Sequence, residues 1–447
     1  MLIADKLENL FKRILPRPFT IAVLLTIFTL VLALLITEKQ SNKSQILVLL
    51  SYWEEGLWNP PLLVFAVQMM LMLVLGHVLA LSKPINYIIE KITSFCNNTA
   101  NSAAIITFCT LLVSLVNWGL GLIFGAIFAR KVAENASEKR LAINYPIIGA
   151  AGYSGLMVWH GGISGSAPIK IAEEEHFLAD KMGVISQSET IFSNMNISVS
   201  ILLLLILPSI MYYIGKRNKG KIITLKKQEI KEESTIHASE RLDHSNIIAL
   251  IFGGIILLLA FYKAFIFPDK ISLNIITPNY INLVLLGLAI IMHQNFNNFL
   301  NAIDNAINGA SGILIQFPLY FGIMGIISNS GMIEIMSSFF VNISTTTTFP
   351  VFTFISAAIV NIFVPSGGGQ WAIQGPIIIE AANQLNVSIS KSVMALAYGD
   401  QITNMLQPFW ALPLLGITGL KAKEILPYTL ILLLAGCIIF IGGLLIF

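Results

Sequence analysis

The chain has 447 residues, of which 55% are hydrophobic and only 11% are charged, and its mean hydropathy is +0.78. A soluble domain usually carries about 25% charged residues, so this composition excludes a water-soluble globular protein. The net charge of +3 is small and comes largely from expected loops, so it gives no indication of nucleic-acid binding. Three widely spaced cysteines predict neither a disulfide framework nor a metal site.

Apolar stretches of about 20 residues, the length that a helix needs to cross the hydrocarbon core, recur along the chain. The first one follows a basic segment and lacks a small-residue cleavage pattern, so we expect a retained helix and not a signal peptide. We place spans near 18–36, 61–82, 143–165, 197–214, 246–266, 277–294, 307–328, 391–417 and 426–447. The apolar stretches 103–129 and 349–385 are interrupted by polar, glycine-containing segments, so each is either one long span or a re-entrant hairpin.

Basic residues predict how the chain is oriented, because Lys and Arg collect in short cytoplasmic loops. The loop 215–245 holds eight of them and is therefore expected to be cytoplasmic. If both interrupted stretches are hairpins, the basic N-terminus and the other basic loops fall on the same side. This agreement favours hairpins and predicts a multi-pass protein of the bacterial inner membrane with a cytoplasmic N-terminus.

The two halves flanking this loop resemble each other weakly, with matched residues about 245 positions apart. The matches are Asn117 with Asn361, Tyr153 with Tyr398, Pro168 with Pro413, and Gln68 with Gln316. We therefore predict an all-α polytopic membrane protein of about nine spans plus two hairpins, built from two inverted repeats with broken helices. The predicted parts are 1–60 (N-terminal helix and external loop), 61–214 (first transporter repeat), 215–245 (basic cytoplasmic linker), 246–306 (connecting helices) and 307–447 (second transporter repeat).

Inverted repeats with broken helices are typical of secondary transporters, whose binding site lies where the breaks meet. In the second break, the glycines after Pro365 leave backbone amides free to converge, and the restarting helix directs its positive end there, which suits a carboxylate. The alternative is a simple turn between hairpin arms, and the same two interpretations apply to the first break. The residues of the two breaks are Asn117, Trp118 and Gly119, and Ser366, Gly367, Gly368, Gly369, Gln370 and Trp371.

Polar groups inside spans are costly unless they face a cavity, so those of the other broken helices are further candidates. For substrate binding these are Ser164, Ser166, Asn361, Gln407 and Trp410. Trp371 and Trp410 are expected to contact an apolar tail. Asp400 is the only acidic residue in 391–417, so Asp400, with Asn404 and His160, is a candidate for coupling to Na⁺ or H⁺. The alternatives are a hydrated surface carboxylate and a packing histidine.

Several motifs together resemble the bacterial short-chain fatty acid transporters, the acetoacetate and butyrate uptake permeases. The motifs are Val364-Pro-Ser-Gly-Gly-Gly-Gln-Trp371, Ile373-Gln-Gly-Pro376, Ala397-Tyr-Gly-Asp400, Gln407-Pro-Phe-Trp-Ala-Leu-Pro413, Val116-Asn-Trp-Gly-Leu-Gly121, Gly161-Gly-Ile-Ser-Gly-Ser166, Ile315-Gln-Phe-Pro318 and Leu15-Pro-Arg-Pro18. The resemblance implies monocarboxylate uptake within a superfamily of inverted-repeat anion transporters, and by analogy a homodimer. Two positions depart from the family pattern: His160 stands where glycine is expected, and Asp400 where glutamate is typical.

The predicted function is cation-coupled import of acetoacetate, butyrate and similar monocarboxylates across the inner membrane. No Lys or Arg lies deep inside a predicted span, which favours a monoanion, although transport of another small organic anion such as a dicarboxylate is the alternative. A membrane enzyme is disfavoured because the sequence has no zinc-protease motif, no paired intramembrane aspartates and no serine nucleophile with a base. We expect no metal and no cofactor, with Na⁺ or H⁺ as the coupling ion.

Overall fold

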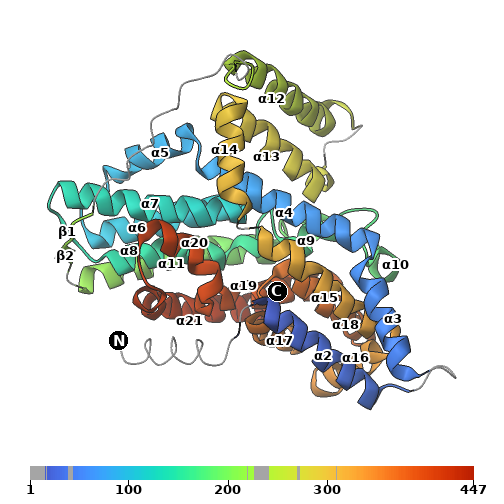
Figure 1. The fold of residues 1–447 in the computed structure, drawn as a ribbon. Helices are drawn as coiled ribbons and strands as arrows, with labels where there is room; N and C mark the ends of the chain where they lie inside the picture. Colours follow the sequence, from blue (N-terminus) through green and yellow to red (C-terminus); the bar gives the residue numbers. More distant parts are fainter. Residues whose placement is uncertain are drawn as a thin grey trace.

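The computed structural model describes residues 16, 18–38, 44–218, 220–225, 241–268, 272–308 and 310–447, which fold almost entirely into helices (Figure 1). In the first half the elements are α2 (Pro18–Ile36), α3 (Gln45–Leu57), α4 (Pro60–Ala80), α5 (Lys83–Thr93), α6 (Thr99–Val116), α7 (Trp118–Glu138), β1 (Ala142–Ile143), α8 (Tyr145–Tyr153), η1 (Ser154–Met157), η2 (Trp159–Gly161), α9 (Ser166–Lys170), α10 (Ala179–Met182), η3 (Gln187–Glu189), α11 (Asn194–Arg217) and β2 (Lys221–Ile222). In the second half they are α12 (Asn246–Phe261), η5 (Tyr262–Ile266), η6 (Leu273–Ile275), α13 (Pro278–His293), α14 (Phe296–Ile307), α15 (Ser311–Asn329), α16 (Met332–Ile343), α17 (Phe349–Phe363), α18 (Gly367–Gln384), α19 (Ile389–Thr403), η7 (Asn404–Leu406), α20 (Pro408–Thr418) and α21 (Ala422–Ile446).

Six helices in the described part of the chain are long and apolar enough to cross a membrane. A seventh span results if α15 and α16, which meet at 80°, are counted together. The prediction of an all-α polytopic membrane protein is therefore confirmed. The basic N-terminal segment and about half of the basic loop, including residues 226–240, lie outside the described residues. The first residues of that loop belong to α11, and Lys221–Ile222 form β2, which pairs antiparallel with β1.

The two interrupted apolar stretches each fold into a helical hairpin and not into one continuous helix. In the first, α6 and α7 are separated by one residue, Asn117, and pack against each other. In the second, Gln370 of α18 donates from Nε2 to the carbonyl oxygen of Ala357 in α17 at 2.8 Å, and Gln374 reaches Ser356 at 3.1 Å. These two hydrogen bonds hold α17 and α18 side by side.

The helices around the hairpins are arranged reciprocally. In the first half α2 and α3 pack on α15 of the second half, and α13 and α14 pack on α4 of the first. The helices α4 and α15 contact each other and run in opposite directions across the view (Figure 1). The approach is close where α3 crosses α15, because a Cβ added to Gly56 would lie 2.3 Å from the carbonyl oxygen of Phe321. This arrangement is what two inverted repeats would produce.

The spans 143–165 and 391–417, which we predicted to contain broken helices, are interrupted midway, and the chain there forms α8, η1, η2 and α9, and α19, η7 and α20. The hydroxyl of Tyr153 donates to the carbonyl oxygens of Asn404 and Gln407, at 2.8 and 3.2 Å. The matching Tyr398 donates to Oδ1 of Asn196, whose Nδ2 in turn donates to the carbonyl oxygen of Gly161. The interrupted helices leave carbonyl oxygens without helical partners, and these need other hydrogen-bond donors inside a membrane. Tyr153 supplies one directly to the break in the second half, and Tyr398 acts on the break in the first half through Asn196.

The structure differs from the prediction between the first two spans. The stretch that we expected to be an external loop contains the helix α3, which packs along α15. Its apolar residues follow a helical spacing, and two of them, Leu49 and Trp53, contact the core. The stretch 246–306 consists of helices as expected, and α12 stands away from the body, packed mainly on α13 (Figure 1).

Candidate functional site

A small cavity of about 20 Å³ lies where the two hairpin tips meet the two breaks. Its walls come from both halves of the chain: Met69, Trp118, Leu156, Trp159, Ser166, Phe317, Ser366, Gly367, Gly368, Asn404 and Trp410. A volume of this size holds one water-sized group. The conformation is therefore closed around a site that must widen before an organic anion fits.

The first hairpin tip is held by hydrogen bonds from side chains that the sequence singled out. Asn117 caps α7, since its Oδ1 accepts the N–H of Leu120 at 2.7 Å, while its Nδ2 donates to the carbonyl oxygen of Met72 in α4. Ser164 accepts the N–H of Trp118 at 3.0 Å and so joins the tip to the first broken helix. Gly119 lets the tip lie directly against α4 and does not line the cavity.

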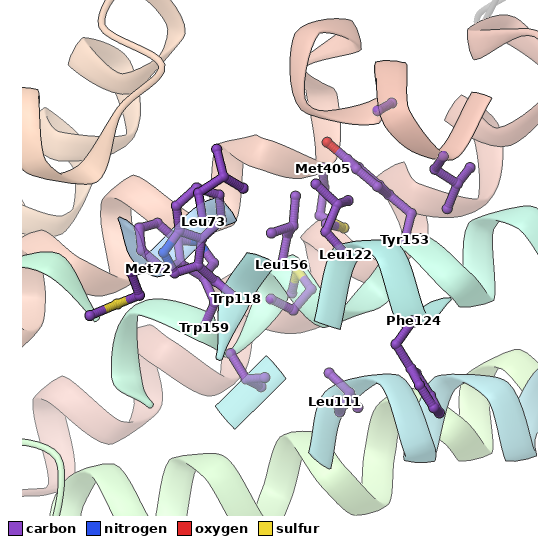
Figure 2. Close-up of a cluster of buried hydrophobic side chains, with 14 of the residues drawn as sticks. Met72, Leu73, Leu111, Trp118, Leu122, Phe124, Tyr153, Leu156, Trp159 and Met405 are labelled. Atoms are coloured by element: carbon purple, nitrogen blue, oxygen red, sulfur yellow. The ribbon is translucent and has the colours of Figure 1, made fainter. Parts of the chain in front are cut away.

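Three tryptophans form one wall of the cavity. The ring of Trp118 lies 5.7 Å from that of Trp159 and 5.4 Å from that of Trp410, the second pair edge to face at 86°. Figure 2 shows Trp118 and Trp159 together, with Leu73, Met72 and Leu156 beside them. Aromatic and aliphatic surface of this kind suits a short hydrocarbon tail. Trp410, which we predicted to lie at a pocket, lines this cavity.

The second hairpin tip presents backbone to the cavity. Ser366 caps α18 by accepting the N–H of Gly369 at 3.2 Å. A Cβ on Gly367 would lie 2.6 Å from Trp159 and 2.8 Å from His160, so only glycine lets this tip close on the first broken helix. Glycines at the start of a helix leave its amides accessible, which is the arrangement that attracts an anion.

A buried Asp400–His160 pair lies directly behind this tip. Oδ2 of Asp400 is 2.7 Å from Nδ1 of His160, and the two side chains are 1% and 0% exposed. Nε2 of His160 accepts the N–H of Ala167 at 3.1 Å, so the ring proton sits on Nδ1 and is donated to the carboxylate. The other carboxylate oxygen, Oδ1, has no hydrogen-bond partner among the described residues.

Amides of the second half surround the same pair. Nδ2 of Asn361 donates to the backbone oxygen of Asp400, to Thr403 Oγ1 at 3.0 Å and to Asn404 Oδ1 at 3.1 Å. Gln407 donates to the backbone oxygen of Asn361. Of these residues only Asn404 lines the cavity. Asn361 and Gln407 therefore hold the broken helix in shape around it.

Other predicted residues lie further from the cavity. Gln370 is engaged within its hairpin, as described above, and Gly369 packs on Tyr320, 2.6 Å from where its Cβ would stand. Trp371, which we expected at the substrate tail, is fully buried in a separate apolar cluster with Leu178 and Ile171. It lies one helical turn beyond Gly367, so it supports the hairpin and does not form the cavity wall.

Sequence reasoning missed some of the residues that the structure brings to the site. Met69, Leu156 and Phe317 line the cavity, and as single apolar residues within apolar spans they carried no distinguishing signal, although Phe317 lies in one of the motifs quoted above. The prediction that no Lys or Arg lies deep inside a predicted span did not consider a buried lysine outside those spans. Lys170 at the end of α9 is 3% exposed, five residues beyond the end that we gave to the predicted span 143–165.

Comparison with known proteins decides the family. The family model described as "Short chain fatty acid transporter" matches residues 2–447. The chain belongs to the short-chain fatty acid transporter family. Two relatives, both named as candidate short-chain fatty acid transporters, are 36% identical over 443 residues in Escherichia coli (strain K12), covering 97% of both chains, and 35% identical over 445 residues in Haemophilus influenzae, covering 96% of both.

Two solved structures share the fold of this short-chain fatty acid transporter family member. They are the YdaH transporter of Alcanivorax borkumensis, with a TM-score of 0.58 at 13% identity over 96% of this chain and 98% of that one, and MtrF of Neisseria gonorrhoeae, with a TM-score of 0.60 at 12% identity over 98% and 97%. At such identities the likeness establishes the architecture alone. The chain is a multi-pass membrane transporter and not an enzyme.

Proposed function

We propose that the protein imports short-chain monocarboxylates such as butyrate and acetoacetate across the bacterial inner membrane, with the closed cavity as the substrate site. The observation that carries this proposal is the convergence of two hairpin tips and two helix breaks on one small space. Backbone amides at Gly367 and Gly368, with the hydroxyls of Ser366 and Ser166, would receive the carboxylate. The tryptophan wall would cover the tail.

Alternating access follows from the size of the cavity. At about 20 Å³ it cannot hold butyrate, so the tips must separate from the broken helices to admit substrate from one side and later release it to the other. The glycines at the second tip allow close approach without side chains in between. The tip therefore acts as the moving part in this mechanism.

We further propose that a proton on Asp400 drives uptake. Its Oδ2 is committed to the N–H of His160, whereas Oδ1 has no partner among the described residues and would carry the proton. Because Nε2 of His160 already accepts a backbone N–H, the ring cannot take up a second proton without losing that bond. The carboxylate, next to the second tip, would then be the titrating group, with His160 positioning it.

The test is uptake of radiolabelled butyrate by proteoliposomes with imposed H⁺ or Na⁺ gradients, and with acetoacetate and succinate as competitors. Accumulation that follows the proton gradient and is inhibited by acetoacetate supports the proposal. In the Asp400→Asn variant we expect exchange of internal for external butyrate to persist while gradient-driven accumulation is lost. Transport of succinate without butyrate would instead favour a dicarboxylate transporter, and accumulation driven only by Na⁺ would refute the proton mechanism.

We also propose that the protein forms a homodimer with its N-terminus in the cytoplasm. The helix α12 stands off the body and packs mainly on α13, which leaves apolar side chains such as Ile247 and Leu258 exposed to lipid or to a second copy. Mass measurement of the detergent-solubilised protein by light scattering tests the dimer. Labelling of a cysteine added at the N-terminus, in intact cells and in permeabilised cells, tests the orientation.

A further inference from the structure

An open hollow of about 700 Å³ lies beside the closed cavity. Its lining includes Gln68 of α4, Lys170 at the end of α9, and Glu173 in the turn that follows, and we refer to it as the vestibule. Ser166 lines the closed cavity and Lys170 lines the vestibule, and they are one turn apart on the same short helix. The two spaces are therefore neighbours.

A thin aromatic layer separates the vestibule from the cavity. Nζ of Lys170 lies 5.5 Å from the ring centre of Phe65, and that ring lies 6.3 Å from the ring of Phe317. Both rings also meet Gly368, since a Cβ there would stand 3.0 Å from an atom of each. Phe317 and Gly368 line the cavity itself. A displacement of these two rings would join the two spaces.

Lys170 and Gln68 hold a carboxylate between them, and that carboxylate belongs to the chain itself. One oxygen of Glu173 pairs with Nζ of Lys170, and the other accepts from Nε2 of Gln68 at 3.0 Å. Nζ of Lys170 also donates to Oε1 of Gln68 at 3.1 Å. We refer to Nζ of Lys170 and Nε2 of Gln68 together as the cradle. Asn282 does not contact the carboxylate, but its Nδ2 donates to the backbone oxygen of Gln68 at 2.9 Å and so helps to hold the cradle in place.

We infer that this cradle is a second binding site for the carboxylate of a short monocarboxylic acid, occupied by Glu173 when substrate is absent. Glu173 lies outside regular helix and is partly exposed, so its side chain can turn into the vestibule and leave both donors to an incoming acid. The two donors, with the apolar side chains of Pro61 and Val64 in the same vestibule, match a carboxylate with a short apolar tail. This inference rests on the proposed function.

The surrounding charge selects for a single negative charge on the ligand. Once displaced, Glu173 remains near the site, and Glu174 and Glu175 on the rim are both exposed in the same vestibule. A dicarboxylate would place its second charge among these three glutamates with one lysine to offset them. The vestibule therefore disfavours dicarboxylates by charge repulsion, whereas the side chains that line the cavity are uncharged and cannot do so.

The experiment measures the KM and maximal rate of butyrate uptake in proteoliposomes, with succinate as competitor. Lys170→Gln should raise KM roughly tenfold with little change in maximal rate, because it removes the charge-assisted bond at the cradle. Glu173→Gln should lower KM several-fold, since a neutral amide competes less well than a carboxylate, and should let succinate compete. Glu189→Gln is the matched control, because it makes the same change at an exposed glutamate of η3 that does not line the vestibule, and its KM should stay within twofold of the unmodified protein.

Lys170→Gln leaves Glu173 without its partner and could fail to fold, so the double variant Lys170→Gln/Glu173→Gln is included. It keeps a neutral hydrogen-bonding pair, and its KM should still be raised. A double variant with the KM of the unmodified protein would overturn the inference and make the pair purely structural. An unchanged KM in Lys170→Gln would do the same, whereas absence of butyrate uptake by the unmodified protein would overturn the proposed function together with this site.

Discussion

Adding a single methyl group at the second hairpin tip should slow transport without unfolding the protein. In Gly367→Ala an ideally placed Cβ would stand 2.6 Å from Cη2 of Trp159, so either the ring or the tip must shift to restore ordinary contact. The Trp159 ring cannot easily yield, because it is stacked on the ring of His160 at 4.4 Å and packed against Trp118. The tip itself must therefore retract.

Overpacking of this kind costs about 1–3 kcal/mol. The cost falls on the closed conformation alone, since the clash disappears once the tip separates from the broken helix. Each 1.4 kcal/mol changes an equilibrium about tenfold, so the closed conformation should become roughly 5- to 150-fold less populated relative to the open ones. If closure is required in each transport cycle, the maximal rate of butyrate uptake should fall by at least about fivefold.

The assay is initial uptake in proteoliposomes, with thermal unfolding in detergent followed by circular dichroism as the measure of folding. Gly254→Ala in α12 is the matched control, because it makes the same change where no atom lies within 4 Å of the new Cβ. It should leave uptake unchanged and raise stability slightly, by about 0.5–1 kcal/mol, since alanine favours a helix over glycine. An uptake rate for Gly367→Ala equal to that of the control would refute the reasoning that the tip closes on Trp159.

Two further predictions concern stability. Asn117→Ala should lower the free energy of unfolding by about 1–2 kcal/mol because α7 loses its cap, and Asn117→Ser should recover most of the loss; equal thermal midpoints for all three proteins would contradict this. Burial lowers the pKa of His176 below its ordinary value of 6.5, with a weaker opposing effect from its bond to Gly183. The folded protein thus favours neutral His176. The contribution of His176 to the free energy of unfolding is therefore fully present above pH 6.5, and it falls as the pH drops from 6.5 to the pKa of the folded state, below which no more is lost. The thermal midpoint should therefore fall more between pH 7 and pH 5 in the unmodified protein than in His176→Gln, and parallel pH profiles would show that this residue is not responsible.

The breaks and hairpins could be predicted from sequence because their signal is local. Polar and glycine-rich segments such as the one around Asn117 interrupt otherwise apolar runs, and backbone inside a membrane must then find partners within the protein. Once such segments are located, the reasoning that they converge follows from the repeat. The same reasoning predicted that the breaks containing Trp118 and Ser366 meet, and it made Asp400 a candidate for ion coupling. In the structure Trp118 and Ser366 line the cavity, and Asp400 lies behind the second tip.

What could not be predicted depends on contacts between distant parts of the chain. Lys170 resembled a loop lysine because its burial is created by Phe65 and Gln68, about a hundred positions away. Trp371 shares a helix with the glycine tip, but at 1.5 Å per residue it lies about 6 Å further along the axis than Gly367, where Leu178 covers it. The helix α3 was missed because its two glutamates made it resemble a solvent-exposed loop.

The tryptophan wall has an optical consequence. Of the six tryptophans in the chain, the three that line the cavity are packed with ring centres 5.4 to 5.7 Å apart along the cluster. The emission of an indole depends on the groups that contact it, and Trp159 is further stacked on the imidazole of His160. Half of the tryptophans of the protein therefore lie at the site that opens and closes. Each transport cycle should be visible as a change in emission from the native protein, without an added dye.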